Sequence, residues 1–145
     1  MDKNRILTKF DELNSYLEEL ESIKPLNFEE YCSSIKEKRS CERLLQISIE
    51  AVIDICNILV SELNLGLPSE EEEIFKKLEG KRIITKSLSA ILSGMKGVRN
   101  ILVHKYGTVK DEIIFEIVSE KLGDFEKFKE EIINFLKSSS KKPKN

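Results

Sequence analysis

Apolar residues recur at steps of three and four along almost the whole chain, which is the spacing of one face of an α-helix. The first such stripe consists of Ile6, Phe10, Leu13, Leu17 and Leu20. It predicts a helix over about residues 2–23. We find no alternating strand pattern, no internal repeat and no linker long enough to divide the 145 residues. The chain is therefore expected to fold as one all-α domain.

Breaks in this pattern mark the ends of the expected helices. Pro25 ends the first helix, and residues 27–34 are expected to be irregular. A longer helix is predicted over about residues 35–63, because the next glycine and proline, Gly66 and Pro68, interrupt the pattern soon after it.

The second half of the chain carries further helical patterns. Ser69 is expected to cap a helix that begins with four glutamates, since Glu72 lies at capping-box spacing and acidic residues favour this end of the helix dipole. Another helix is predicted over about residues 85–103. A following one is capped by Thr108 and ends near Leu122.

A last helix follows Gly123 and Asp124 and carries several phenylalanines. The expected architecture is thus an up-and-down bundle of four or five main helices that occupies residues 1–137. Residues 138–145 have no apolar side chain and are expected to form a flexible, lysine-rich tail.

The composition excludes several classes of protein. With 24 Lys and Arg against 26 Asp and Glu, the net charge of −2 gives no molecule-wide basic footprint for nucleic acid. One histidine, His104, and three dispersed cysteines, Cys32, Cys41 and Cys56, argue against zinc. We expect no metal, no cofactor and reduced thiols. No uncharged apolar run approaches the ~18 residues of a membrane span, so we expect a cytoplasmic protein without membrane contact.

One arginine lies on the apolar side of its predicted helix. On a helical wheel, Arg99 falls among Leu92, Met95, Leu102 and Val103. A buried guanidinium stays charged, and leaving it unpaired costs on the order of several kcal/mol. Arg99 therefore needs a carboxylate, a phosphate or a route to solvent.

A polar strip on the longest predicted helix offers carboxylates for Arg99. Glu50 and Asp54 lie in register with Arg43, Asn57 and other polar residues on an otherwise apolar helix. The strip is either a solvated edge or a polar groove inside the assembly. Glu50 and Asp54 are the candidate partners of Arg99, in a buried ion pair or at an anion-binding site.

His104 follows Arg99 by five residues, which places the two side chains about 140° apart on an unbroken helix. They converge only if the helix loosens near Val103 or if a cleft includes both flanks. A histidine exchanges a proton near neutral pH, and an arginine stabilises charge on phosphate oxygens. The pair therefore suits phosphodiester cleavage without metal, although a lone histidine is often only structural.

Residues 99–106, RNILVHKY, resemble the RNxxxHxY signature of the HepT-like branch of the HEPN superfamily. The likeness extends to an E-x-x-x-D stretch, here Glu50 to Asp54, and to the glycine and proline break at residues 66–68. An apolar and glycine-containing run, residues 95–98, precedes the arginine. In order and spacing, the resemblance covers about residues 2–136.

This resemblance implies a helical homodimer in which two motifs form one composite cleft and cut RNA without metal. It implies that His104 acts as acid and base while the ribose 2′-OH attacks the adjacent phosphate, which Arg99 holds. Asn100 would help to orient the site, and Asp54 or Glu50 would position Arg99.

The resemblance also implies a regulatory partner. Tyr106 resembles the tyrosine to which a nucleotidyltransferase antitoxin attaches AMP, which would make this chain the toxin of a toxin–antitoxin pair. Two alternatives remain. The chain could be a non-catalytic HEPN module that binds nucleotide or docks a nucleotidyltransferase, or a structural helical dimer in which Arg99 and Asp54 form a buried pair.

Overall fold

The computed structural model describes residues 2–67, 70–104 and 110–140, which form seven helices and no strand. The helices are α1 (Lys3–Ser22), α2 (Phe28–Ser33), α3 (Ile35–Glu62), α4 (Glu71–Gly80), α5 (Lys86–His104), α6 (Asp111–Glu120) and α7 (Gly123–Ser140). The four longest, α1, α3, α5 and α7, have 18 to 28 residues and are the main helices. The prediction of an all-α helical bundle is confirmed.

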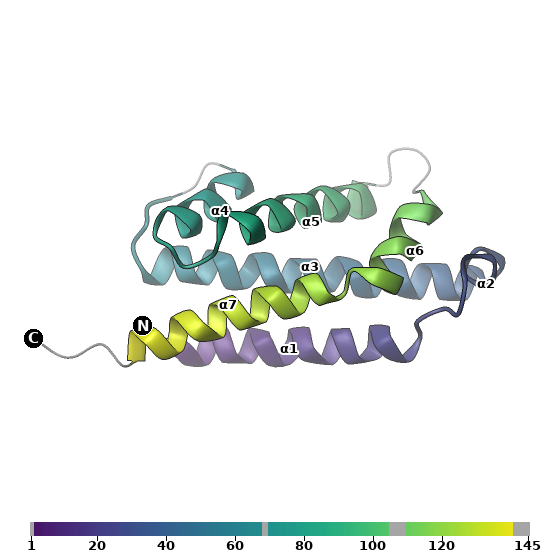
Figure 1. The fold of residues 1–145 in the computed structure, drawn as a ribbon, viewed down its shortest axis with the longest axis horizontal. Coiled ribbons are helices and arrows are strands. Elements are labelled where there is room, and N and C mark those ends of the chain that lie inside the picture. The colour runs from purple at the N-terminus through teal and green to yellow at the C-terminus, as the bar shows by residue number, and fades with distance from the viewer. Residues whose placement is uncertain (1, 68–69, 105–109, 141–145) are drawn as a thin grey trace, which may run out of the picture.

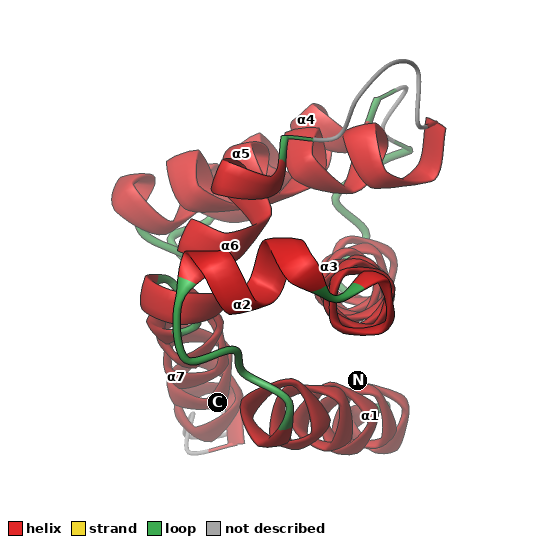
Figure 2. Cartoon of the chain, turned by 90° about the vertical axis from the view of Figure 1, so that its right-hand side faces the viewer, coloured by secondary structure: helices red, strands yellow, loops and turns green. Residues whose placement is uncertain are grey.

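The long helix α3 lies at the centre of the bundle. It contacts α1 on one side and both α4 and α5 on another, and Figure 1 shows it between them. In Figure 2, where the bundle is viewed from one end, α7 lies opposite α3 and the short helix α2 crosses the end of the bundle. Helix α5 thus rests on α3 and also contacts α7.

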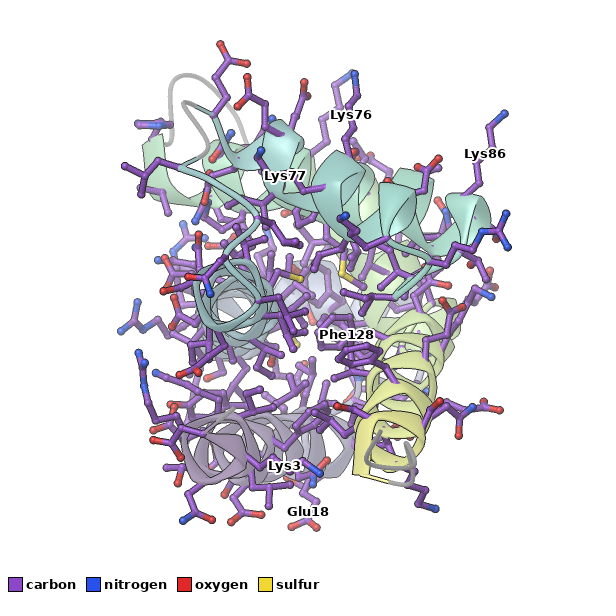
Figure 3. All side chains as sticks on the ribbon, turned by 90° about the vertical axis from the view of Figure 1, so that its left-hand side faces the viewer. Lys3, Glu18, Lys76, Lys77, Lys86 and Phe128 are labelled. Atoms are coloured by element: carbon purple, nitrogen blue, oxygen red, sulfur yellow. The ribbon has the colours of Figure 1, made fainter. Side chains whose placement is uncertain are left out.

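The predicted apolar stripe of α1 is buried in this arrangement. All five of its residues have exposed fractions of 7% or less. Opposite them, Phe128 of α7 points into the centre of the bundle (Figure 3) and its ring stacks on that of Phe10, with centroids 6.2 Å apart. Burying one such side chain contributes about 1.5–3 kcal/mol, so the α1–α7 contact helps to close the bundle.

Helix α3 is long and apolar enough to cross a membrane by length and composition alone. In the fold, however, it is the core helix, and residues on most sides of it are buried against its neighbours. Its apolar character is therefore accounted for by packing inside the domain.

The segment predicted to be irregular, residues 27–34, contains helix α2. Asn27 caps this helix, because its side-chain oxygen accepts a hydrogen bond of 2.8 Å from the backbone N–H of Glu30. A helix of six residues is too short to show an apolar period in the sequence. Ser34 then caps α3 by accepting from the N–H of Glu37.

Two helices begin later than the sequence predicts. Helix α4 has Glu70 at its N-cap, and α6 has Lys110, in neither case with a side-chain capping bond. The predicted caps, Ser69 and Thr108, lie outside the described residues. Both helices carry acidic residues in their first turn, and these favour the positive end of the helix dipole without a cap.

The ends of α3 and α4 share one geometry. Asn64 after α3 and Arg82 after α4 both have a positive φ. The N–H of the next residue then donates to the backbone carbonyl five positions earlier, as in a Schellman motif. Gly66 also has a positive φ, of 97°, so the predicted break after α3 is a true turn. Helix α7 continues to Ser140, beyond the predicted domain boundary at residue 137.

Candidate functional site

Arg99 and His104 both lie on the last turns of α5. The Arg99 side chain is only 15% exposed, and Leu92, Met95 and Leu102, which share its side of the helical wheel, are buried. His104 is the last residue of α5 and is exposed. The prediction that Arg99 lies toward the apolar side is confirmed.

Helix α5 is unbroken through His104. The loosening near Val103 that would bring both side chains together does not occur, so the two leave the helix in directions about 140° apart. A site that uses both residues must therefore extend around two flanks of α5. Val103 itself is 45% exposed and is not part of the buried arc.

The carboxylate that pairs with Arg99 lies on α4. Nη2 of Arg99 donates a hydrogen bond to Oε1 of Glu71, and Nε of the same side chain donates to Oδ1 of Asn100 at 3.0 Å. One turn earlier on α5, Nζ of Lys96 donates to Oε1 of Glu72 at 2.9 Å. The first turn of α4 is thus joined to α5 by two neighbouring ion pairs.

The predicted pairing of Arg99 with Glu50 or Asp54 is therefore wrong in this structure. Asp54 is exposed and pairs with Lys9 of α1, with 3.3 Å between Nζ and Oδ2. Glu50 is half-buried on α3. Because α4 packs on α5, Glu71 reaches Arg99. Arg99 and Asp54 therefore do not form the buried pair that was the structural alternative.

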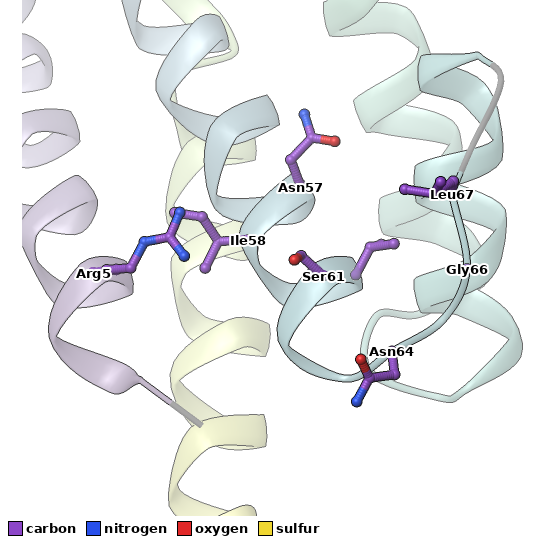
Figure 4. Close-up of a pocket in the computed structure, with 8 residues that line it drawn as sticks. Arg5, Asn57, Ile58, Ser61, Asn64, Gly66 and Leu67 are labelled. Carbon is purple, nitrogen blue, oxygen red and sulfur yellow. The ribbon is translucent and has the colours of Figure 1, made fainter.

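Within the single chain, the polar strip of α3 is a solvated edge. Arg43, Asp54, Asn57 and Ser61 are exposed, whereas Gln46 and Glu50 are half-buried. At the C-terminal end of the strip, Asn57 and Ser61 line a surface pocket together with Arg5 (Figure 4). Neither Arg99 nor His104 lines this pocket.

The ion pairs of α4 define the electrostatics around Arg99. The hydrogen bond from Lys96 lowers the pKa of Glu72 below its ordinary value, so this carboxyl is ionised at neutral pH. In this chain, each of the two cations therefore already has a carboxylate partner.

Sequence reasoning missed Glu71 and Glu72 as neighbours of the motif. In the sequence, capping and the helix dipole are a sufficient explanation for the acidic run at the start of α4. The opposed charges on α5, Lys96 and Arg99 at a spacing of three, were the available signal. Lys105 and Tyr106, the remaining residues of the motif, lie outside the described residues.

The described part of the chain contains no metal-binding cluster, and two of its three thiols are held protonated by burial. Over residues 2–67, 70–104 and 110–140, no three His, Cys, Asp or Glu side chains converge in a group that could hold a metal ion. Burial, with the carboxylates of Glu37 and Glu42, raises the pKa of Cys41 to about 11, so its thiol is protonated at neutral pH. Burial also raises the pKa of Cys56.

Comparison with known families and proteins places these residues in context. The family model described as ribonuclease HepT-like matches residues 13–132. The tRNA nuclease HepT of Aphanizomenon flos-aquae is 29% identical over 131 residues, which are 90% of this chain and 89% of that protein. The mRNA nuclease HepT of Shewanella oneidensis is 39% identical over 84 residues, 58% of this chain and 63% of that one.

Solved structures give the same result. A tri-AMPylated Shewanella oneidensis HEPN toxin, in complex with an MNT antitoxin, is 29% identical with a TM-score of 0.82 and covers 89% of this chain and 96% of its own. YutE of Bacillus subtilis, a cytosolic protein of unknown function, has the same TM-score at 14% identity, covering 99% of this chain and 96% of its own. That second likeness concerns the fold alone.

Proposed function

This chain belongs to the ribonuclease HepT-like family, and from that premise we propose that it is the toxin of a toxin–antitoxin pair, an endoribonuclease that cuts RNA without a metal ion. The observation that carries the proposal is the placement of Arg99 and His104 on the last turns of α5, one nearly buried and one exposed. The fold around them matches that of an AMPylated HEPN toxin.

In the proposed reaction, the imidazole of His104 accepts the proton of a ribose 2′-OH, which attacks the adjacent phosphorus. The bond from phosphorus to the 5′ oxygen breaks, and the leaving oxygen takes up a proton. Arg99 stabilises the negative charge that develops on the phosphate oxygens. The products are a 2′,3′-cyclic phosphate and a 5′-hydroxyl end.

The proposed site includes two copies of the chain. The chain has one histidine, so a second imidazole, to protonate the leaving oxygen, comes only from another copy. Next to the motif, Ile101 and Val103 of α5 are 50% and 45% exposed, which leaves an apolar surface for the second α5. The resulting homodimer would bring two Arg99 and two His104 side chains into one cleft.

The proposed regulation acts on Tyr106, two residues after His104 in the motif. A cytoplasmic nucleotidyltransferase antitoxin would attach AMP to this tyrosine. The added phosphate would occupy the position of the RNA backbone and repel it. The related Shewanella oneidensis toxin is itself AMPylated and bound to an MNT antitoxin.

The activity is tested with the purified chain in the presence of EDTA. We expect cleavage of RNA by the wild type and a loss of about 10²–10⁴-fold for Arg99→Ala and for His104→Ala, the range typical of general acid–base groups. Arg5→Ala, which removes an exposed arginine on α1, serves as the matched control and should retain activity. Equal cleavage by all four proteins would contradict the roles given to Arg99 and His104.

The regulation is tested by intact-mass spectrometry after co-expression with a nucleotidyltransferase antitoxin of this family. We expect added AMP units in the wild type and none in Tyr106→Phe. The unmodified variant should remain an active nuclease. A chain that binds ATP or AMP but cleaves no RNA would favour the non-catalytic module instead.

A further inference from the structure

We propose that Glu71 is a positioning residue of the ribonuclease site, which orients the guanidinium of Arg99 toward the RNA phosphate. The inference rests on the proposed function, since it assigns an added role within that site. It starts from the fact that the carboxylate reaching Arg99 comes from α4, whereas Arg99, Asn100 and His104 of the motif lie on α5.

The two bonds of Arg99 hold one particular edge of its guanidinium. Nε and Nη2 lie on the same side of this planar group, and they donate to Asn100 and Glu71 respectively. Nη1, on the other side of the guanidinium from Nε, takes part in neither bond. Its N–H groups are donors of the kind that bind a phosphate oxygen.

Asn100 cannot provide this orientation by itself. It is the next residue on the same helix, so its bond to Nε moves with Arg99 and α5. Glu71 belongs to a separate helix, which is anchored by the buried side chains of Ile74, Phe75 and Leu78. Glu71 therefore fixes Arg99 relative to the body of the protein.

The neighbouring pair between Glu72 and Lys96 provides an internal comparison. It joins the same turn of α4 to the same face of α5, with 2.9 Å between Nζ and Oε1. Its removal eliminates one negative charge and one link between the helices, as the removal of Glu71 does. It leaves both bonds of Arg99 in place, so Glu72 is the matched control for charge and for helix docking.

An opposite role for Glu71 would give an opposite result. If its carboxylate only competed with RNA for Arg99, its removal would make the guanidinium more available to phosphate. Cleavage would then become faster or its KM would fall. A positioning role predicts slower cleavage, because a misplaced charge stabilises the transition state less well.

The kinetic test compares Glu71→Ala, Glu71→Gln, Glu72→Ala and the wild type on one short RNA in EDTA. We expect Glu71→Ala to lower kcat about 10- to 100-fold with KM changed less than about threefold. Glu71→Gln, which still accepts a hydrogen bond, should recover part of the loss. Glu72→Ala should change kcat less than about twofold. Equal losses for the Glu71 and Glu72 variants, or a gain for Glu71→Ala, would overturn the proposal.

A second readout does not depend on activity. In ¹⁵N NMR spectra at low temperature, the Nη2–H signal of Arg99, assigned by its loss in Arg99→Lys, should be sharp and shifted in the wild type and in Glu72→Ala. It should move toward the position of an exposed arginine in Glu71→Ala. An unchanged signal would overturn the positioning role. If the wild type cleaves no RNA, the proposed function fails, and this spectrum still decides whether Glu71 holds Arg99.

Discussion

At the scale of single residues, Arg99 shows what a helical wheel can predict about a side chain and what it cannot. The wheel places this arginine toward apolar neighbours, and the cost of an unpaired buried charge then requires a partner for it. Both inferences agree with the structure, where its side chain is 15% exposed and ion-paired. The identity of the partner was mistaken, because a wheel orients a side chain about its own helix axis only.

The three thiols provide a prediction at the same scale. Cys41 and Cys56 are buried and have raised pKa values, whereas Cys32 is half-buried. A thiolate is the form that reacts with alkylating reagents. We expect iodoacetamide at pH 8 to modify Cys32 in the folded protein and to leave Cys41 and Cys56 unmodified, as measured by peptide mass spectrometry.

The control for this labelling is the unfolded chain, in which all three thiols should react at similar rates. Rapid modification of Cys56 in the folded protein would contradict the burial of α3, since this residue has no exposed surface.

At the scale of elements, helix α5 depends on its neighbours at both ends. Near its C-terminal end, α4 supplies Glu71 to Arg99. At its N-terminal end, Glu131 of α7 accepts hydrogen bonds from the backbone N–H and the Oγ1 of Thr85, at 2.7 and 3.0 Å. The hydroxyl of Thr85 in turn accepts from the N–H of Leu88. Side chains from α4 and α7 thus hold the two ends of α5 by hydrogen bonds.

The bond network of Glu131 predicts a pH-dependent contribution to stability. Burial would raise the pKa of Glu131, but the hydrogen bonds from Thr85 and Lys127 outweigh this effect, so its pKa lies below the ordinary 4.5. A carboxyl with a lowered pKa stabilises the fold above its unfolded-state pKa and loses this contribution as the pH falls. Glu131→Ala should therefore lower the free energy of unfolding by about 1–2 kcal/mol at pH 7.

Urea denaturation of both proteins at pH 7 and at pH 3 measures this contribution. The difference between wild type and Glu131→Ala should shrink as the pH falls below 4.5. Glu130→Ala, which removes the exposed glutamate next to it, should leave stability nearly unchanged. A difference that stays constant down to pH 3 would show that the charge of Glu131 is not involved.

At the scale of the whole molecule, the arrangement of α5 makes oligomerisation part of the proposed mechanism. Within one chain, Arg99 and His104 lie on different flanks of an unbroken helix, and the chain has a single histidine. Two copies that meet along α5 would place an arginine of one opposite a histidine of the other. The apolar residues Ile101 and Val103 lie on the surface where this contact would form.

Sedimentation provides the prediction at this scale. We expect a species of about twice the 16.7 kDa chain mass for the wild type and a single-chain species for Val103→Asp. The variant should retain its helical circular dichroism and lose RNA cleavage. Leu67→Asp, at an apolar residue that is 99% exposed, is the control and should stay dimeric. A monomeric wild type that cleaves RNA would contradict the composite cleft.

Much of this protein was determined by its sequence alone. The apolar period and its breaks located α1, α3 and α5 to within a few residues, and the RNILVHKY segment identified the family. Short helices without a full apolar period, such as α2, escaped prediction. The N-caps of α4 and α6 are Glu70 and Lys110 instead of the expected Ser69 and Thr108. These are all properties of residues close together in the chain.

Only the tertiary structure decided which charges meet. Glu71 and Arg99, which pair, are separated by 28 positions in the sequence. Asp54 pairs with Lys9 of α1 and not with Arg99. Such contacts depend on which helices pack together and how closely they approach. This packing is set by the burial of apolar side chains throughout the core. The sequence therefore showed that Arg99 requires an anion, while the packing of α4 on α5 determined that this anion is the carboxylate of Glu71.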